Sequence, residues 1–351
     1  MTDMNKPLLV DIAIAGGGII GLSLGLELRQ RELSVAVIER DQAMSSASWA
    51  AGGMLAVNDP QNPPELLPIS VLSWALYPAY LDRIEALSGR RVALRTMRTL
   101  QEIAPGSGSA RLAAEADIAE YAPALDTTGH RFEWLDEGSL DPNDLREALP
   151  KAFRAAGGML LEGAEVLGVE SMTHGVVVNT PRERISAGMF VNCCGAWAGG
   201  PQLGGLPVLP IKGQMTNLRC QSERLRCVVR MPKLYMIPRG DGRVTIGATL
   251  EHAGFDATVQ ESSIRQMIDT ALHLLPEAAT PKPMESWAGL RPGTPDGLPI
   301  LGPAESKHCW HATGHYRDGI LLAPGTARVM AQSMLGESPD VPLNAFTPTR
   351  F

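Results

Sequence analysis

The chain has 351 residues, of which 44% are hydrophobic and 20% are charged, as is typical of a globular protein with one or two domains and a substantial core. Its net charge of −7 and the lack of a long basic run argue against a nucleic-acid partner. The five cysteines, Cys193, Cys194, Cys220, Cys227 and Cys309, have no metal-ligand spacing. We therefore expect structural thiols in a cytoplasmic protein, with no metal site and no transmembrane segment.

The most informative stretch is the first strand, turn and helix, residues 8–29. Residues 8–15 are mostly apolar and predict a buried strand, Gly16 to Gly21 form a glycine-rich turn, and residues 22–29 continue with helical spacing. Gly16 permits a tight turn, Gly18 lets backbone N–H groups approach a pyrophosphate, and Gly21 allows close packing of helix on strand. The spacing predicts a dinucleotide site, with a merely structural glycine turn as the alternative.

A second strand, residues 34–38, ends in Glu39, whose carboxylate can accept hydrogen bonds from an adenosine ribose. An acid at this position favours the free 2′-hydroxyl of FAD or NAD and repels the phosphate of NADP. The helix dipole would face the phosphates.

The middle of the chain alternates between irregular and regular segments. Residues 44–55 are rich in Ser, Ala and Gly, which predicts either a loop that lets a flat ring approach the backbone or an ordinary connection. Residues 57–68 carry four prolines and predict an irregular segment. The spacing then predicts an amphipathic helix over 71–88, with one apolar face formed by Leu72, Ala75, Leu76, Ala79, Tyr80, Ile84 and Leu87. Short strands and a polar helix, roughly 108–121, follow, and a helix over 144–156 begins at Asp141-Pro142-Asn143.

The second half predicts more strands. We expect strands over 159–161, 164–169, 176–179 and 185–192, the last running into the small-residue turn Cys193 to Trp197. Residues 206–280 are typical of antiparallel structure, with a hairpin of 235–239 and 243–247 and a helix over 262–275. The glycine-rich segments 287–302 and 313–320 precede a closing helix over 321–335.

Four motifs together resemble the glycine oxidase branch of the D-amino-acid oxidase family, over residues 11 to about 335. They are the N-terminal glycine unit, Ala50–Leu55, Trp287–Pro292 and Gly314–Leu322. The branch includes the thiamine-pathway enzyme that converts glycine into its imine. The resemblance implies a Rossmann-like α/β FAD-binding domain (residues 1–88, 138–205 and 284–351) interleaved with a mixed or antiparallel-sheet substrate domain (89–137 and 206–283).

The resemblance also implies the cofactor contacts. Residues 50–55 would lie along the isoalloxazine ring, and the helix start at 319–322 would point N–H groups at the N1/O2 end of that ring. The implied FAD-binding residues are Gly16, Gly18, Ile19, Ile20, Gly21, Glu39, Arg40, Ala50, Ala51, Gly52, Gly53, Met54, Val166, Cys194, Gly195, Trp197, Arg291, His315, Arg317, Gly319, Ile320 and Leu321. Residues 285–296 contain no cysteine, so we expect FAD to be bound non-covalently.

Three residues are implied substrate ligands: Tyr235, Arg291 and Arg317. An arginine is suited to this role because its planar guanidinium makes two parallel hydrogen bonds to a carboxylate. Arg291 is the first choice. Arg317 could instead pair with Asp318 or a backbone carbonyl, and Tyr235 could be ordinary sheet packing. His315 has no evident partner as a base, and Lys233 could shape the mouth of the site.

The implied reaction is hydride transfer from Cα of glycine, sarcosine or D-alanine to flavin N5, giving an oxoacid, ammonia or an amine, and hydrogen peroxide from O2. One alternative is a D-amino-acid dehydrogenase that passes electrons to a quinone or another carrier. Another is a non-catalytic flavin-binding subunit of a larger complex. Relatives are often oligomers, so we expect a homo-oligomer.

Overall fold

The computed structural model describes residues 7–104, 106–107, 109–278 and 284–351. One part of the fold is an eight-stranded sheet in the order β17-β18-β11-β1-β2-β8, with β10 pairing β11 and β9 pairing β10. Strands β8, β2, β1, β11 and β18 are parallel, as expected for an α/β nucleotide fold. Its strands are β1 (Leu8–Ala15), β2 (Val35–Glu39), β8 (Met159–Glu162), β9 (Gly168–Met172), β10 (Gly175–Asn179), β11 (Arg184–Asn192), β17 (Ile300–Pro303) and β18 (Cys309–Thr313).

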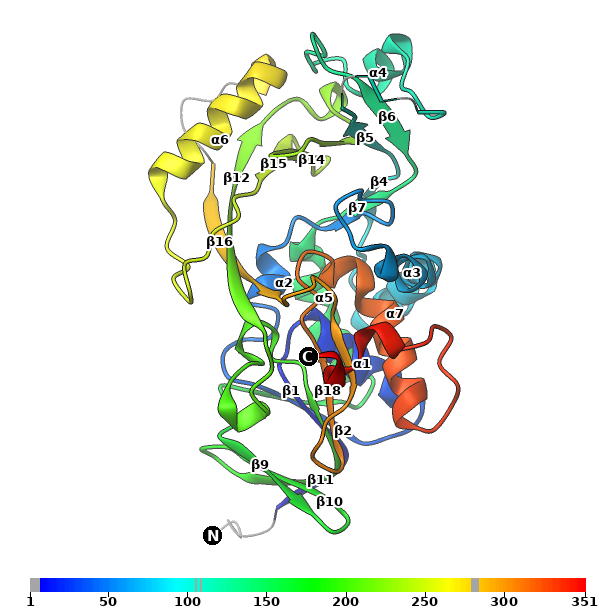
Figure 1. The fold of residues 1–351 in the computed structure, drawn as a ribbon, viewed down its shortest axis with the longest axis vertical. Coiled ribbons are helices and arrows are strands. Elements are labelled where there is room, and N and C mark those ends of the chain that lie inside the picture. Colours follow the sequence, from blue (N-terminus) through cyan, green and yellow to red (C-terminus); the bar gives the residue numbers. More distant parts are fainter. Residues whose placement is uncertain (1–6, 105, 108, 279–283) are drawn as a thin grey trace.

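Four helices pack with this sheet in one apolar core (Figure 1). They are α1 (Ile19–Gln30), α3 (Leu67–Ser88), α5 (Pro142–Ala155) and α7 (Gly319–Met334). Helix α1 approaches its neighbours closely because Gly25 has no side chain: a Cβ there would lie 2.8 Å from the ring of Phe153 on α5. Helix α5 begins where predicted, since the Asp141 carboxylate accepts a hydrogen bond from the Asn143 backbone N–H.

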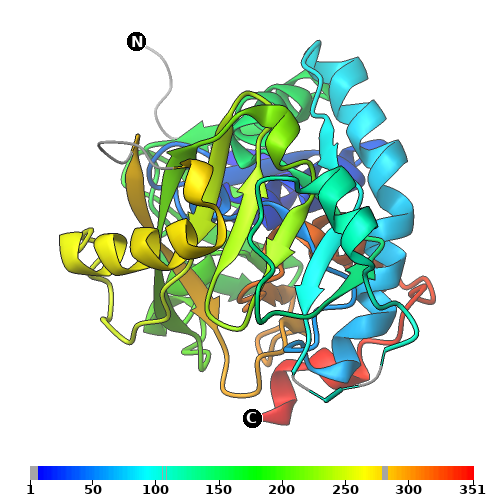
Figure 2. The ribbon, with the colours of Figure 1, turned by 90° about the horizontal axis from the view of Figure 1, so that it is seen from above.

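The other part is a seven-stranded sheet in the order β16-β12-β15-β14-β13-β5-β6. Most of its pairs are antiparallel, and the predicted hairpin is confirmed, with Tyr235 opposite Gly247. Helices α6 (Glu261–Leu274) and α4 (Glu115–Tyr121) lie at its outer side (Figures 1 and 2). Its strands are β5 (Thr99–Glu102), β6 (Phe132–Leu135), β12 (Leu209–Arg219), β13 (Val228–Arg230), β14 (Tyr235–Pro238), β15 (Arg243–Gly247) and β16 (Ser286–Gly293).

A third, small sheet joins β3 (Met54–Leu55), β7 (Gly138–Leu140) and β4 (Leu94–Thr96) between the two parts. The interleaved fold class is thus confirmed, because the chain passes repeatedly from one large sheet to the other. The predicted five-segment domain division stays a prediction. No described helix is both long enough and apolar enough to cross a membrane.

Two sequence predictions about elements are wrong. Residues 164–167 form no strand, because they cross from β2 to β10. The Ala164 N–H donates to the Glu39 carbonyl on β2, and the Leu167 N–H donates to the Asn179 carbonyl on β10. The polar helix is shorter than predicted, since α4 begins at Glu115, and Gly108 lies outside the described residues.

The predicted apolar face of α3 is right only in part, since Ile84 is buried and Leu72, Tyr80 and Leu87 pack against the core, but two of its alanines do not. The helix begins earlier than predicted, at Leu67, with Pro68 in its first turn. Proline is accepted there because a backbone N–H in the first turn has no acceptor within the helix. Ala75 and Ala79 are exposed. The buried face instead includes the small polar Ser73, whose hydroxyl accepts a hydrogen bond from the Gly325 N–H on α7.

Candidate active site

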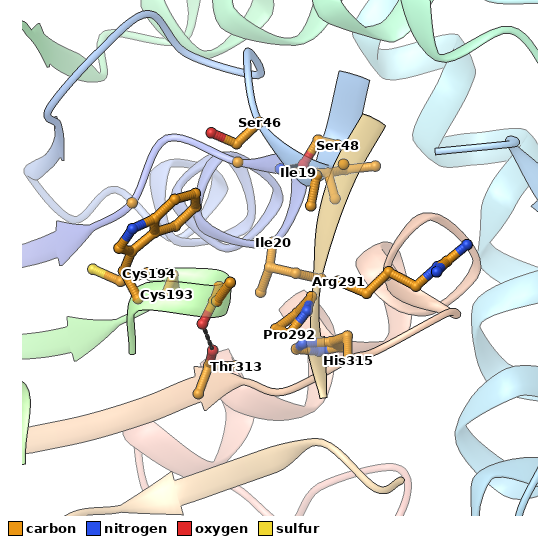
Figure 3. A pocket seen from close by; sticks show the side chains of 18 of the residues that line it. Ile19, Ile20, Ser46, Ser48, Cys193, Cys194, Arg291, Pro292, Thr313 and His315 are labelled. Atoms are coloured by element: carbon orange, nitrogen blue, oxygen red, sulfur yellow. Dashed lines mark hydrogen bonds between the residues drawn. The ribbon is translucent and has the colours of Figure 1, made fainter. Parts of the chain in front are cut away.

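A cavity of about 540 Å³ lies between the two large sheets, and residues far apart in the sequence line it. The starts of α1 and α7, the ends of β2, β11 and β18, the segment 46–56 and the strands β12, β14 and β16 all contribute to its walls. Figure 3 shows labelled side chains from these segments around one space. Of the predicted site residues, every one except Gly21 and Leu321 lines this cavity.

The two exceptions, Gly21 and Leu321, are buried in the packed interior next to the cavity. A Cβ on Gly21 would lie 2.1 Å from the Gly16 carbonyl oxygen, so Gly21 lets α1 pack on the turn rather than facing the cavity. Leu321 is fully buried in the core on α7. Gly319 and Ile320 line the cavity from the first turn of α7, and a contact of the cofactor with the Leu321 backbone N–H stays a prediction.

The glycine turn has the geometry that the motif predicts. Gly16 has a φ of +104°, and a Cβ there would lie 2.3 Å from the Cys193 carbonyl oxygen. The backbone therefore passes between β1 and the end of β11 where no side chain fits. The start of α1 faces the cavity, and its Ile19 N–H donates to the Ser48 hydroxyl at 2.9 Å.

Glu39 stands at the end of β2 and is held by backbone donors. One carboxylate oxygen accepts from the Gly17 N–H at 2.7 Å, and the other accepts from the Asp41 N–H at 2.9 Å. Each oxygen keeps a second lone pair for a hydroxyl of a ligand. Glu39 is thus positioned at the cavity wall as a preformed hydrogen-bond acceptor.

A stack of three side chains forms the wall beside Glu39. The guanidinium of Arg40 lies 3.9 Å from the centre of the Trp197 ring, and Phe255 stacks with Trp197 at 5.5 Å between ring centres. Arg40 and Trp197 are sequence predictions, whereas Phe255 is a lining residue that the sequence analysis missed. It comes from the loop after β15, which the motifs do not cover.

The small-residue segment contains a short helix, α2 (Ala47–Ala50), and the strand β3 rather than a simple loop. Its position is fixed by the Trp287 side chain on β16, which donates to the Ala50 carbonyl at 3.2 Å. Gly52 lies beside Tyr235 and Ile237. A Cβ on Gly52 would be 3.0 Å from Ile237 Cδ1, which is tighter than ordinary contact. Small residues here leave room along the cavity, which favours the first of the two sequence interpretations, a loop that lets a flat ring approach the backbone.

The turn between β18 and α7 places two buried titratable groups at the cavity. Burial lowers the pKa of His315 to about 3, and its Nε2 lies 3.1 Å from the Thr326 hydroxyl. Burial raises the pKa of Asp318 to about 6, although a hydrogen bond from Asn62 opposes that shift. His315 is therefore neutral near pH 7, and Asp318 is mostly ionised. Thr313, another lining residue missed in the sequence, donates to the Gly195 carbonyl at 3.3 Å (Figure 3).

Arg291 on β16 lies at the end of the cavity formed by the seven-stranded sheet. Its Nη1 donates to the backbone carbonyls of Thr249 at 3.1 Å and Lys212 at 3.4 Å. Its guanidinium covers Gly213 on β12, since a Cβ there would lie 2.3 Å from both Nη atoms. No carboxylate among the described residues is within ion-pair distance of Arg291, so its charge remains available for an anion.

Tyr235 and Arg317 line the same end. The Tyr235 hydroxyl contacts the Met215 sulfur at 3.5 Å. Arg317 bonds Asp59 at 3.0 Å and Gln61 at 2.6 Å, so its partners differ from the Asp318 or backbone carbonyl of the alternative interpretation, and its role as a substrate ligand stays a prediction. Contacts with the segment 59–62 explain this difference. Asn62 donates a hydrogen bond to Asp318, while Asp59 and Gln61 accept hydrogen bonds from Arg317. Asp59 is a lining residue that no sequence pattern indicated.

The cavity as a whole fits an extended dinucleotide. It combines a turn that excludes side chains, an acid at the tip of the second strand, and two helix starts. The Arg40–Trp197 pair and Glu39 would hold the nucleoside side, and residues 50–54 with the start of α7 would hold the ring side. Arg291 and Tyr235 would then face the ring and a carboxylate-bearing ligand.

Comparisons with known proteins agree with this geometry. A profile described as "FAD dependent oxidoreductase" matches residues 11–333. The chain is 33% identical to a glycine oxidase of Pseudomonas aeruginosa, over 96% of this chain and 98% of that protein. It resembles the crystal structure of glycine oxidase from Geobacillus kaustophilus with a TM-score of 0.92 and 30% identity, covering 98% and 99% of the two chains. It is also 35% identical to a bifunctional ThiO/ThiG protein of Synechocystis, spanning 97% of this chain but only 54% of that protein.

Proposed function

Since the chain belongs to the family of FAD-dependent oxidoreductases, we propose that it oxidatively deaminates glycine or a similarly small amino acid such as sarcosine or D-alanine. The observation that supports this most directly is Arg291: a guanidinium at the cavity end that is oriented by backbone carbonyls and lacks a carboxylate partner among the described residues. FAD, when bound, would supply the two-electron acceptor, with O2 as the proposed final acceptor.

The side chains contribute position rather than proton transfer. Arg291 binds the substrate carboxylate through two N–H groups and turns Cα toward the ring side of the cavity. Tyr235 adds a hydroxyl donor on the same side. The buried, neutral His315 is a weak base, because its pKa lies near 3. The proposed reaction uses a substrate whose amine is already neutral, so kcat/KM should rise with pH up to the pKa of that amine.

The first experiment is anaerobic mixing of the purified protein with glycine, sarcosine, D-alanine and D-proline, followed by readmission of air. Loss of the flavin absorbance with glycine, and its rapid return with peroxide in air, supports an oxidase. Loss without return in air would instead support a dehydrogenase with another carrier as acceptor. A protein that binds glycolate, a carboxylate that does not react, yet bleaches with none of these amines would contradict the proposed substrates.

The proposal also covers the cellular compartment and the oligomeric state of the protein. All five cysteines are free thiols, which favours a reducing compartment such as the cytoplasm. We also propose assembly into a homo-oligomer. Light scattering of the purified protein during size-exclusion chromatography tests the assembly, and a monomer at micromolar concentration would contradict it.

A further inference from the structure

A second cavity, of about 350 Å³, adjoins the substrate end of the first. The two cavities share Asp59, Tyr235, Arg291, Tyr316 and Arg317. The rest of the second cavity is formed by Gln61, by β5, by β13 with the turn after it, and by the loop after β15. A substrate held by Arg291 would therefore have space on the side away from the dinucleotide, which glycine alone would not fill.

The deepest polar group of this second cavity is Arg230, the last residue of β13. It is 4% exposed. Its Nε donates to Gln101 at 2.5 Å and its Nη1 donates to Glu137 at 3.0 Å, but its Nη2 has no hydrogen-bond partner among the residues that the structure describes. A buried guanidinium N–H without an acceptor is costly, so this donor points to a ligand that supplies an oxygen.

The charges around the cavity favour an anion. Four cations line it: Arg230, Lys233, Arg291 and Arg317. Three acids balance part of this charge, since Asp318, at the wall of the first cavity, interacts electrostatically with both Arg230 and Arg317. Asp59 lies 3.0 Å from Arg317 and 4.0 Å from Arg230, and Glu137 bonds Arg230 from outside the cavity lining. Among the described residues no acid lies within ion-pair distance of Lys233 or Arg291, so two cations remain unpaired, whereas the carboxylate of a simple amino acid at Arg291 meets only one of them.

We propose that the second cavity binds a second carboxylate, so that the enzyme prefers amino or imino diacids whose first carboxylate lies on Arg291. Arg230 and the exposed Lys233 are the specificity-determining residues of this subsite. The proposal rests on the proposed function for the position of the first carboxylate. The second carboxylate can be carried by the amine nitrogen, as in N-(carboxymethyl)glycine, or by the Cα substituent, as in D-aspartate.

Steady-state oxygen uptake with matched pairs tests the preference. Each diacid is compared with its neutral monoamide, N-(carbamoylmethyl)glycine or D-asparagine, which has nearly the same size. We expect kcat/KM to favour at least one diacid over its own amide by about tenfold or more, since a charge-assisted hydrogen bond replaces a neutral one. The pair that shows the preference identifies where the second carboxylate is attached. Equal kcat/KM within both pairs would overturn the proposal.

Variants then assign the preference to the two cations. Arg230→Lys keeps a charge beside Glu137 but loses the second N–H arm, and we expect it to lower the diacid-to-amide ratio by about tenfold. Lys233→Met removes an exposed, solvent-screened charge and should lower the ratio by about threefold. Lys307→Met, at an exposed lysine between β17 and β18, is the matched control. Because a ratio of two substrates is insensitive to general damage to the fold, an unchanged ratio in both cavity variants would refute the assignment.

Ligand binding separates this proposal from the proposed function. Malonate and succinate are diacids that cannot be oxidised at an amine, and acetate is the corresponding monoacid. Their Kd values are measured from the change in flavin absorbance. Diacids that bind about tenfold more tightly than acetate support the subsite even if no amine is oxidised, whereas acetate binding as tightly as the diacids argues against it even if glycine is a good substrate.

Discussion

Gly213→Ala should disable substrate binding without unfolding the protein. The Arg291 guanidinium lies directly over Gly213, and a Cβ would be 2.3 Å from both Nη atoms and 2.4 Å from Cζ. Ordinary contact needs about 3.5 Å, so the guanidinium must move by about 1 Å. A displacement of that size at a positioning group costs about 100-fold in rate, or about 2.7 kcal/mol of transition-state stabilisation. We therefore expect kcat/KM for glycine to fall about 100-fold.

The fold should tolerate this change because the obstructing atoms are the end of a long side chain. Replacing glycine by alanine in a strand also stabilises by roughly 0.5–1 kcal/mol, which offsets the weakened contacts of Arg291 with Thr249 and Lys212. Flavin content, Tm, kcat/KM and the Kd of glycolate are measured for this variant and for Gly168→Ala. Gly168 lies on β9, and a Cβ there would meet nothing within 4 Å. A Gly213→Ala variant with kcat/KM within threefold of the parent would refute the role of Arg291.

Three further predictions concern single groups. Tyr235→Phe should raise KM for glycine about fivefold through the loss of about 1 kcal/mol of hydrogen bonding, and an unchanged KM would assign Tyr235 to packing alone. The pKa of Asp318 is about 6 in the folded protein against 3.8 in the unfolded chain. The folded protein therefore holds this proton more tightly, and the free energy of unfolding falls as pH rises from about 4 to 6. Urea unfolding of Asp318→Asn should therefore show a gain over the parent of about 3 kcal/mol at pH 7 that vanishes below pH 4, whereas a gain that does not vary with pH would contradict the shift. Hot acid should release unmodified FAD, and flavin that stays with the precipitated protein would contradict non-covalent binding.

The nucleotide end of the site was predictable because its determinants are local. Gly16, Gly21 and Glu39 sit within one strand-turn-helix-strand unit, and the backbone clashes that a Cβ would cause occur within that unit or with the adjacent end of β11. The spacing of the glycines therefore carries almost all of the required information. Arg291 and Tyr235 were found through a resemblance, since nothing in their own neighbourhoods distinguishes them from other strand residues.

The remaining site residues were missed because tertiary contacts place them. Asp59 comes from a proline-rich segment with no periodicity, and it reaches Arg317 only because the chain folds back by more than two hundred residues. Arg230 ends a three-residue strand whose partner β5 lies far upstream in the sequence. The α3 face was predicted only in part for a related reason: the helix packs its Ser73 against a glycine of α7, and hydrophobicity alone does not reveal that contact.

The way Arg291 is held has a consequence for the behaviour of the protein in ordinary buffers. Carbonyl dipoles from Thr249 and Lys212 orient the guanidinium without cancelling its charge. The pocket therefore attracts small anions in general, and acetate, formate or chloride in a buffer compete with the substrate for the same cation. Apparent affinities should weaken with the concentration and kind of the background anion. An amine without a carboxylate, such as methylamine, cannot form the hydrogen bonds to Arg291. It should therefore be a poor substrate even though it is small enough to enter the cavity.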